Sequence, residues 1–493
     1  MNPLQLEDPP RHRSWPQDRE SSVRLRSSLV VQGRSSSVAL HDAASRMSAC
    51  VYLEKPGLTV MQAAMVAFNS AVGSTVAILG SFPSQCGWQA FGVIMLTVAI
   101  TGALQQSALI STSCQLGAVT FDELCQPLPA WSSRITVASF LVYFWGCMGF
   151  YCQFVEVFLA DQVCPALCGS GSDWLCNSEY RIGLLVSIFF ALVSWPPQLA
   201  GTAAVCINYT NFAVKWVVII TAVAKGVHTA FFVEAERTYT AWAPAGMVRI
   251  ACMLMGSYAN TGIMPQLAAD IDKSQQERAA KLCPSIAVGL QFFVYLALAY
   301  SAYFGLGNAI GTDVFASYNE LYPDFMTSIL QGGLALLVWL SSPLVILPMK
   351  AQIYGLLSRG EADLSKAPPS LQVGLTFILA LSGAMAPCIV GTEAFTKFLF
   401  FLACTCGNWF NFFLPAMVVL YCQVWSPKHT GDKNLPRVLC VWLFFLGGLG
   451  LIDAGFQILE SLSPKDSSAK LPLPTRCAAW RHAAYPDGNA MVV

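Results

Sequence analysis

Eleven apolar stretches, each close to the roughly 20 residues that cross a hydrocarbon core, constrain this chain more than any other feature. Hydrophobic residues make up 55% of the 493 residues and charged residues only 11%, whereas a soluble domain averages about 25% charged residues. The sequence therefore predicts an all-α protein embedded in a lipid bilayer. The predicted spans are Met61–Phe82, Phe91–Ser111, Ile135–Ala160, Ile182–Ala200, Phe212–Ala230, Met247–Ala268, Cys283–Leu306, Met326–Leu347, Leu371–Val390, Phe398–Tyr421 and Val438–Ile458.

Polar segments flank this region and divide the chain into three parts. Residues 1–56 are rich in Ser and Arg and lack the apolar side chains needed to offset ordering entropy, so we expect a disordered basic tail. Residues 57–460 form the transmembrane domain, and residues 461–493 form a second polar tail. Most of the 28 Lys and Arg residues, with Lys215 counted among them, fall on the side of the N-terminus. The positive-inside rule then predicts a cytosolic N-terminus and, with eleven spans, a C-terminus outside.

Three cysteines share one polar loop between the third and fourth predicted spans. Cys164, Cys168 and Cys176 are expected to lie outside, where two of them can form a disulfide, and the pairing stays open. Most of the other cysteines stand singly in apolar runs, where a small buried thiol is the simplest interpretation.

Two apolar stretches carry residues that interrupt helices. A spanning helix has no water for its backbone, so a break at membrane depth must line a cavity or be covered by protein. Such interrupted segments are the best sequence indication of a binding site in a transporter. The first break pairs Gly73-Ser74 with Pro83, and the second pairs Gly256-Ser257 with Pro265. They fall in the first and sixth spans, as expected for a five-plus-five inverted repeat with an eleventh helix appended.

Breaks of this kind predict a site for a small dipolar molecule. Freed N–H groups at half-helix N-termini suit a carboxylate, while freed carbonyls suit a cation or an ammonium group, so an amino acid matches both. The alternative is that Gly and Ser only allow helices to pack closely, but two breaks at repeat-related positions favour a site. The predicted substrate-binding residues are Gly73, Ser74, Thr75, Ser257, Tyr258, Asn260 and Thr261.

A coupling-ion site is also predicted. Asn69 lies one turn before Gly73, and Ser341 and Ser342 precede a proline in the eighth span, so together they offer oxygen ligands for sodium. The alternative is that these hydroxyls bond only their own helix.

Ionisable residues within predicted spans are functional candidates by default. For proton coupling, Glu156 and His228 are the first candidates, and snorkelling to the interface is the alternative for both. Lys225 lies near His228, and Asp453 is placed more deeply in the eleventh span.

Other classes of function find no support in the sequence. The chain has no Walker loop, no HExxH motif and no nucleophile elbow, so no enzyme is expected. Its formal net charge of zero gives no indication of a nucleic-acid partner. No cofactor is expected beyond H⁺ or Na⁺ as a coupling ion.

The first predicted span resembles that of the amino acid/auxin permeases, within the wider amino acid–polyamine–organocation superfamily. Their pattern is N-x-x-x-G-[ST]-G-I-L-x-x-P followed by G-W. The residues in register are Asn69, Gly73, Ser74, Gly87 and Trp88. The departures are Thr75 in place of the second glycine and Gly80 at the usual proline position, with Pro83 three residues later.

Later spans are similar to the same family. The sixth follows the family's P-x-[IL]-x-x-[ED]-[MI]-x-x-P pattern at Pro265, Leu267, Asp270 and Ile271, with Ser274 replacing the second proline. SSPLVILPMK in the eighth span and NWFNFFLPAMVVLY in the tenth also look like family signatures, through Pro343, Pro348 and Pro415. The resemblance covers nearly all of the chain between the tails.

This resemblance implies a LeuT-like fold and secondary active transport of amino acids, driven by sodium or protons. It also implies a sodium-binding role for Asn69, as in some relatives. We expect a carrier for neutral or cationic amino acids that works by alternating access in the plasma membrane or a vacuolar or lysosomal membrane. The alternative is an amino acid sensor that signals through its N-terminal tail to a regulatory partner.

Overall fold

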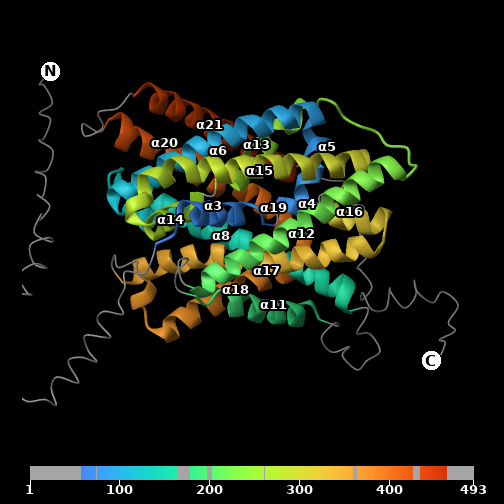
Figure 1. Cartoon of the computed structure of the whole chain (residues 1–493), viewed down its shortest axis with the longest axis horizontal. Coiled ribbons are helices and arrows are strands. Elements are labelled where there is room, and N and C mark those ends of the chain that lie inside the picture. The colour runs from blue at the N-terminus through green and yellow to red at the C-terminus, as the bar shows by residue number, and fades with distance from the viewer. Residues whose placement is uncertain are drawn as a thin grey trace, which may run out of the picture. The chain divides into compact units, whose positions relative to one another are not determined.

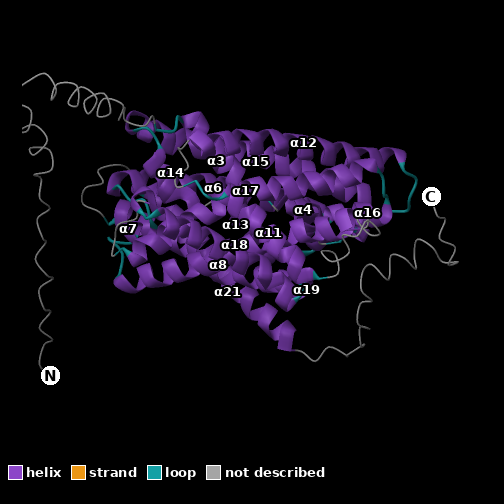
Figure 2. Cartoon of the chain, turned by 90° about the horizontal axis from the view of Figure 1, so that it is seen from below, coloured by secondary structure: helices purple, strands orange, loops and turns teal. Residues whose placement is uncertain are grey.

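The computed structural model describes residues 57–73, 75–164, 178–196, 202–259, 261–311, 313–358, 364–425 and 433–462. Among these residues, eight helices are long and apolar enough to cross a membrane, and nine if one bent helix pair counts as a single span. Figure 1 shows most of these helices lying alongside one another, and Figure 2 shows helices joined by loops, without a sheet. The predicted all-α architecture is confirmed.

Seven of the spanning helices are regular or nearly so. They are α6 (Trp88–Leu116), α8 (Ala130–Phe158), α12 (Thr202–Phe232), α15 (Gln276–Leu306), α17 (Phe325–Leu357), α18 (Pro369–Val390) and α21 (Asn434–Leu462). The eighth combines α19 (Thr392–Leu402), π-helical turns at η9 (Ala403–Gly407), η10 (Trp409–Phe413) and η11 (Leu420–Val424), and α20 (Leu414–Val419). These eight overlap eight of the predicted spans.

The three remaining predicted spans differ from simple helices. The first is the bent pair α3 (Val60–Ala71) and α4 to α5 (Thr75–Ile78 and Phe82–Cys86), joined by the 3-10 turn η2 (Leu79–Ser81). The fourth contains the 15-residue helix α11 (Glu179–Val193), which is shorter than a full span. The sixth is divided into α13 (Met247–Ala259), the 3-10 turn η5 (Thr261–Ile263) and α14 (Met264–Asp270).

Local sequence explains where the first broken span begins and stops. Thr59 caps α3 by accepting from the Gln62 backbone, and the Gln62 side chain bonds back to Thr59. After Ala71, Val72 leaves the helical region with ψ of 75°. Gly87, at φ of +87°, separates α5 from α6, and a Cβ there would meet the backbone of Trp242 at 2.5 Å.

The helices pack in two groups that meet where α12 packs against α17. On one side α15 packs against α3, α6 and α12, and α6 packs against α13 and α14. On the other side α8, α11, α17 and α18 pack together. The two broken spans therefore belong to one group, and α8 belongs to the other.

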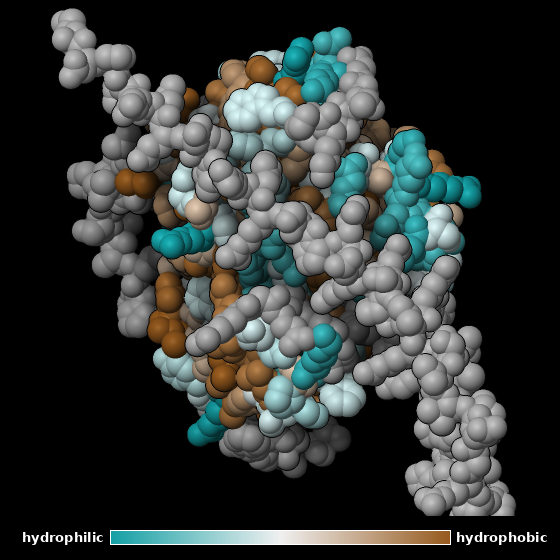
Figure 3. Space-filling view, turned by 90° about the vertical axis from the view of Figure 1, so that its left-hand side faces the viewer, coloured by the Kyte–Doolittle hydropathy of each residue, from teal (hydrophilic) through white to brown (hydrophobic). Residues whose placement is uncertain are grey.

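Where α3 begins, the chain pairs with the end of α14. Leu58 N–H donates to the Asp270 carbonyl at 2.7 Å, and Asp272 N–H donates to the Leu58 carbonyl at 3.1 Å. Figure 3 looks onto this end of the helices, where hydrophilic side chains gather among hydrophobic ones.

At the opposite end, the buried Lys225 ammonium bonds Asp324, the N-cap of α17, at 2.6 Å. Burial by itself would raise the pKa of Asp324, but hydrogen bonds from Lys225 and Thr327 outweigh it and hold that pKa below its ordinary value.

Candidate functional site

The break between α3 and α4 leaves main-chain carbonyls without intrahelical donors. Side chains from neighbouring helices donate hydrogen bonds to two of them. The Tyr295 hydroxyl, on α15, donates to the Ala71 carbonyl at 2.8 Å. The ammonium group of Lys215, on α12, donates to the Asn69 main-chain carbonyl. Both Tyr295 and Lys215 are fully buried. The last turn of α3 is therefore stabilised by two side chains from neighbouring helices.

The second break is held in the same way by two adjacent glutamines of α6. Gln106 donates to the Tyr258 carbonyl, near the end of α13. Gln105 donates to the Thr261 hydroxyl in η5 at 2.8 Å. Both glutamines are fully buried. Because α13 stops inside the protein, the Gln106 amide replaces an intrahelical donor that the Tyr258 carbonyl lacks.

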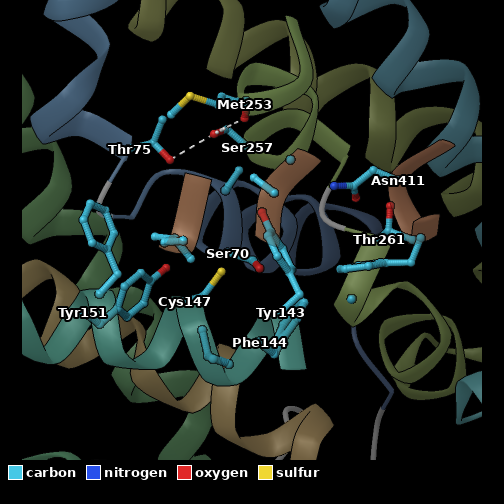
Figure 4. A pocket seen from close by; sticks show the side chains of 18 of the residues that line it. Ser70, Thr75, Tyr143, Phe144, Cys147, Tyr151, Met253, Ser257, Thr261 and Asn411 are labelled. Carbon is cyan, nitrogen blue, oxygen red and sulfur yellow. Dashed lines mark hydrogen bonds between the residues drawn. The ribbon is translucent and has the colours of Figure 1, made fainter. Parts of the chain in front are cut away.

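A cavity of about 120 Å³ lies between the two breaks and α8 (Figure 4). Thr75 from α4 and Ser257 from α13 meet across it, with 3.1 Å between their hydroxyl oxygens. Figure 4 shows Thr75 and Tyr151 at one end, and Thr261 and Asn411 at the other. None of the described residues that line the cavity is acidic or basic. Its walls are aromatic and aliphatic, with a few hydroxyl, thiol and amide groups.

Aromatic side chains of α8 close the cavity against both breaks. A Cβ on Gly73 would run into the Tyr151 hydroxyl, and a Cβ on Gly262 would overlap the Phe144 ring. The missing side chains at these glycines thus allow α8 to approach the interrupted backbone closely.

The structure separates the predicted substrate residues into groups. Thr75, Ser257 and Thr261 line the cavity. Gly73 lies beside it against Tyr151, and the Tyr258 side chain points away, with its hydroxyl donating to Met95 Sδ at 3.7 Å. Ser74 and Asn260 lie outside the described residues.

The predicted cation site is occupied in part by an amine. Asn69 is buried behind the break, and its side-chain nitrogen donates to the Asn208 carbonyl at 2.8 Å. Its main-chain carbonyl accepts from Lys215, whereas its side-chain oxygen has no hydrogen-bond partner among the described residues. The prediction that Lys215 belongs with the charges on the side of the N-terminus is wrong. The helix begins at Thr202, which places Lys215 well inside it, with no exposed surface.

The two predicted serines face different neighbours. Ser341 accepts a hydrogen bond from the Asn211 amide at 3.1 Å, one helical turn before Lys215 on α12. Ser341 also donates to the Leu337 carbonyl of its own helix at 2.9 Å. Ser342 instead bonds the Ser194 hydroxyl at 2.8 Å. Only Ser341 therefore contacts the helix face that also reaches Asn69.

The other ionisable candidates lie away from the cavity. Glu156 is buried and lines a separate small cavity of about 30 Å³ beside Glu179. Asp453 forms an ion pair with Arg249 at 3.4 Å. His228 stacks on Phe232 near the end of α12.

Cys164 is disulfide-bonded. Its predicted partners, Cys168 and Cys176, lie outside the described residues. Among the residues that the structure describes, no group of three or more His, Cys, Asp or Glu side chains could hold a metal ion.

Sequence reasoning missed four polar residues that support or line the site. They are Gln105, Gln106, Tyr295 and Asn411. A signal existed for the glutamines, because two adjacent amides inside an apolar run need buried partners. Tyr143 and Asn411 come together only through packing of α8 on η10, which the sequence does not specify.

This arrangement places two interrupted spans around a central cavity in an all-α membrane protein. Two solved transporters share the fold. One is MhsT in complex with L-phenylalanine (TM-score 0.53, 12% identity, covering 82% of this chain and 99% of that one). The other is MHP1, a nucleobase-cation-symport-1 family transporter, closed with bromovinylhydantoin bound (TM-score 0.53, 12% identity, covering 84% and 96%).

The family model described as "Transmembrane amino acid transporter protein" matches residues 56–458. The chain belongs to this family, which confirms the predicted resemblance. No curated protein matches the chain.

Proposed function

We propose that this protein is a secondary active transporter that carries a neutral amino acid by alternating access and is coupled to protons. The proposal is based on the cavity between the two interrupted spans. A helix stops on each side of this cavity, at the first break and at the second. An amino acid bound in MhsT, a transporter of the same fold, supports the choice of substrate. The family to which the chain belongs supports it independently.

The proposed position of the substrate follows from the backbone groups at the two breaks that no side chain of the protein holds. At the first break, the substrate carboxylate meets the amides at the start of α4, near Thr75, and the Tyr151 hydroxyl beside Gly73. Its ammonium group meets carbonyls of Gly256 and Ser257, because the Tyr258 carbonyl is held by Gln106. The lack of a carboxylate among the described lining residues favours a neutral side chain over a cationic one.

Lys215 supports a proton as the coupling ion. Within the described residues, no carboxylate forms an ion pair with Lys215. Its ammonium bonds the main-chain carbonyl of Asn69, so a cationic group already lies beside the predicted sodium site. An amine can take up and release a proton within the transport cycle, whereas sodium would have to displace it.

We further propose that the two breaks are related by a five-plus-five inverted repeat, with α21 as the appended helix. Gly73 at the first break and Gly262 at the second both approach aromatic side chains of α8, so both breaks can move relative to α8 as the cavity opens to either side.

The test is uptake of radiolabelled alanine into proteoliposomes under imposed ion gradients. We expect saturable uptake that an inward proton gradient drives and that replacing sodium with choline leaves unchanged. Uptake that requires sodium would overturn proton coupling. Absence of saturable uptake of every one of the twenty amino acids would overturn the transporter proposal.

A further inference from the structure

The cavity ends, on the side away from Thr75 and Tyr151, at the side-chain amide of Asn411 (Figure 4). Asn411 lies in η10 and lines the cavity, with only 3% of the residue exposed. In the part of the chain that the structure describes, its side chain makes no hydrogen bond. By contrast, Asn408, on the same π-helical stretch, donates to the Gly447 carbonyl at 2.7 Å. A buried amide without a partner destabilises the protein, so Asn411 is suited to a ligand.

A second polar group converges on the same place. A Cβ on Gly256 would lie 2.8 Å from the Tyr143 hydroxyl and 3.5 Å from Asn411 Nδ2. The absent side chain of Gly256 therefore leaves a small space that both groups face. The Tyr143 ring is held there by Phe410, edge to face, with 5.2 Å between ring centroids.

We infer that Asn411 and Tyr143 form a subsite for the substrate's side chain, which selects neutral amino acids that carry a hydroxyl or a carboxamide. This inference rests on the proposed function and deepens it. With the substrate carboxylate near Thr75, its side chain extends toward Asn411 at the opposite end of the cavity (Figure 4). The amide and the hydroxyl both donate and accept, and so does each of the favoured side chains.

Two physical arguments set the selectivity. A site built to bond a substrate hydroxyl or amide disfavours an apolar analogue of the same size, because that analogue leaves buried polar groups unpaired. A charged side chain is excluded because no opposite charge lies among the described lining residues. Two comparisons test the effect of the polar group at similar side-chain size. They are threonine with valine, and asparagine with leucine.

The experiment measures inhibition of radiolabelled alanine uptake into proteoliposomes by each of these four unlabelled amino acids. We expect threonine to inhibit at least about fivefold more tightly than valine, and asparagine than leucine, which is the ratio that one unpaired buried polar group produces. Asn411→Leu should remove both preferences or reverse them. Tyr143→Phe, which keeps the ring and its packing, should reduce them at least about twofold.

Asn408→Leu is the matched control, because Asn408 faces α21 and its loss should leave both preferences as they are in the wild type. The inference is overturned if the wild type shows no preference within either pair, or if both Asn411→Leu and Tyr143→Phe retain it. If Asn411→Leu yields no folded protein, Tyr143→Phe alone decides. Absence of any alanine uptake by the wild type is a different result, since it counts against the proposed function and not against the subsite alone.

Discussion

Polar groups on the two sides of the first break differ in their hydrogen bonding. Behind it, Lys215 bonds the Asn69 carbonyl and Tyr295 bonds the Ala71 carbonyl. In front of it, the hydroxyls of Ser70 and Tyr151 line the cavity and make no hydrogen bond to the described residues. The interrupted helix is thus stabilised on the side away from the cavity, while these two hydroxyls on the cavity side have no partner among the described residues. The predictions below test this division.

Removing the amine behind the break should have the largest effect. Lys215→Met leaves the Asn69 carbonyl without its donor and removes the ionisable group. We expect proton-driven alanine accumulation to fall at least about tenfold and to lose its response to an imposed pH gradient. Lys215→Arg should also lose the response, because arginine stays charged.

Lys350 offers a matched control for this prediction. It is also fully buried, but it bonds the Ser194 carbonyl at 3.0 Å and the Thr376 hydroxyl at 2.9 Å, away from both breaks. Lys350→Met should lower stability by about 1–3 kcal/mol and keep the response to the pH gradient. The division fails if the two lysine variants behave alike.

A larger side chain where the second break meets α8 should have the next largest effect on uptake. In Gly262→Ala, the new methyl group overlaps the Phe144 ring, so α8 must move away from the second break. We expect alanine uptake to fall about tenfold, measured as the initial rate per folded transporter. Gly289→Ala is the control, since a Cβ there meets no atom within 4 Å. It should keep uptake and stabilise α15 by about 0.5–1 kcal/mol. Equal rates in both variants would contradict the close approach of α8.

Removing one supporting bond of the second break should have a moderate effect on stability. Gln106→Leu leaves the Tyr258 carbonyl without a side-chain donor. An unpaired buried carbonyl costs about 1–3 kcal/mol, which we expect as a lower thermal midpoint in detergent. Gln153→Leu is the comparison, because its bond runs to the Thr396 hydroxyl, at 3.2 Å, and leaves no backbone group unpaired. A larger loss for Gln153→Leu would argue against a special need for support at the break.

Apolar length and helix-breaking residues were sufficient to predict the eight long apolar helices and the positions of both breaks. Those signals are local, and the hydrocarbon core imposes them directly on the sequence. The supporting residues could not be predicted in the same way. Lys215 is the fourth residue of the predicted span Phe212–Ala230 and is therefore counted as a charge at the interface, because nothing in the sequence shows that the helix begins at Thr202.

The orientation of side chains at a break could not be predicted from the sequence either. Tyr258 and Ser257 are neighbours in the sequence, yet Ser257 lines the cavity and Tyr258 points toward α6. Near a break the helical periodicity stops, so the pattern no longer indicates which face each residue occupies. Asn411 gave no signal at all, because the residues that lie near it, Tyr143 of α8 and Gly256 of α13, are far away in the sequence.

The smallest effect is expected farthest from both breaks, at the ion pair between Lys225 and Asp324. Asp324 has a folded-state pKa below its unfolded value of about 3.9. The pair therefore contributes its stability above about pH 4 and loses it as the pH falls through the folded-state pKa. The side chain of Asp324 is 43% exposed, so solvent screens the pair and Asp324→Asn should cost less than about 1 kcal/mol at pH 7.

That substitution isolates the charge, because asparagine is also a good N-cap and keeps the bond to the Thr327 backbone. Thermal midpoints of the wild type and Asp324→Asn should therefore converge as the pH is lowered below 4. Glu277→Gln is the control, since the Lys281–Glu277 pair is highly exposed on both sides and should contribute nothing measurable. A gap between wild type and Asp324→Asn that persists in acid would show that the carboxylate acts through packing instead of charge. A gap larger than that of Gln106→Leu would mean that the outer ion pair matters more than the support behind the breaks.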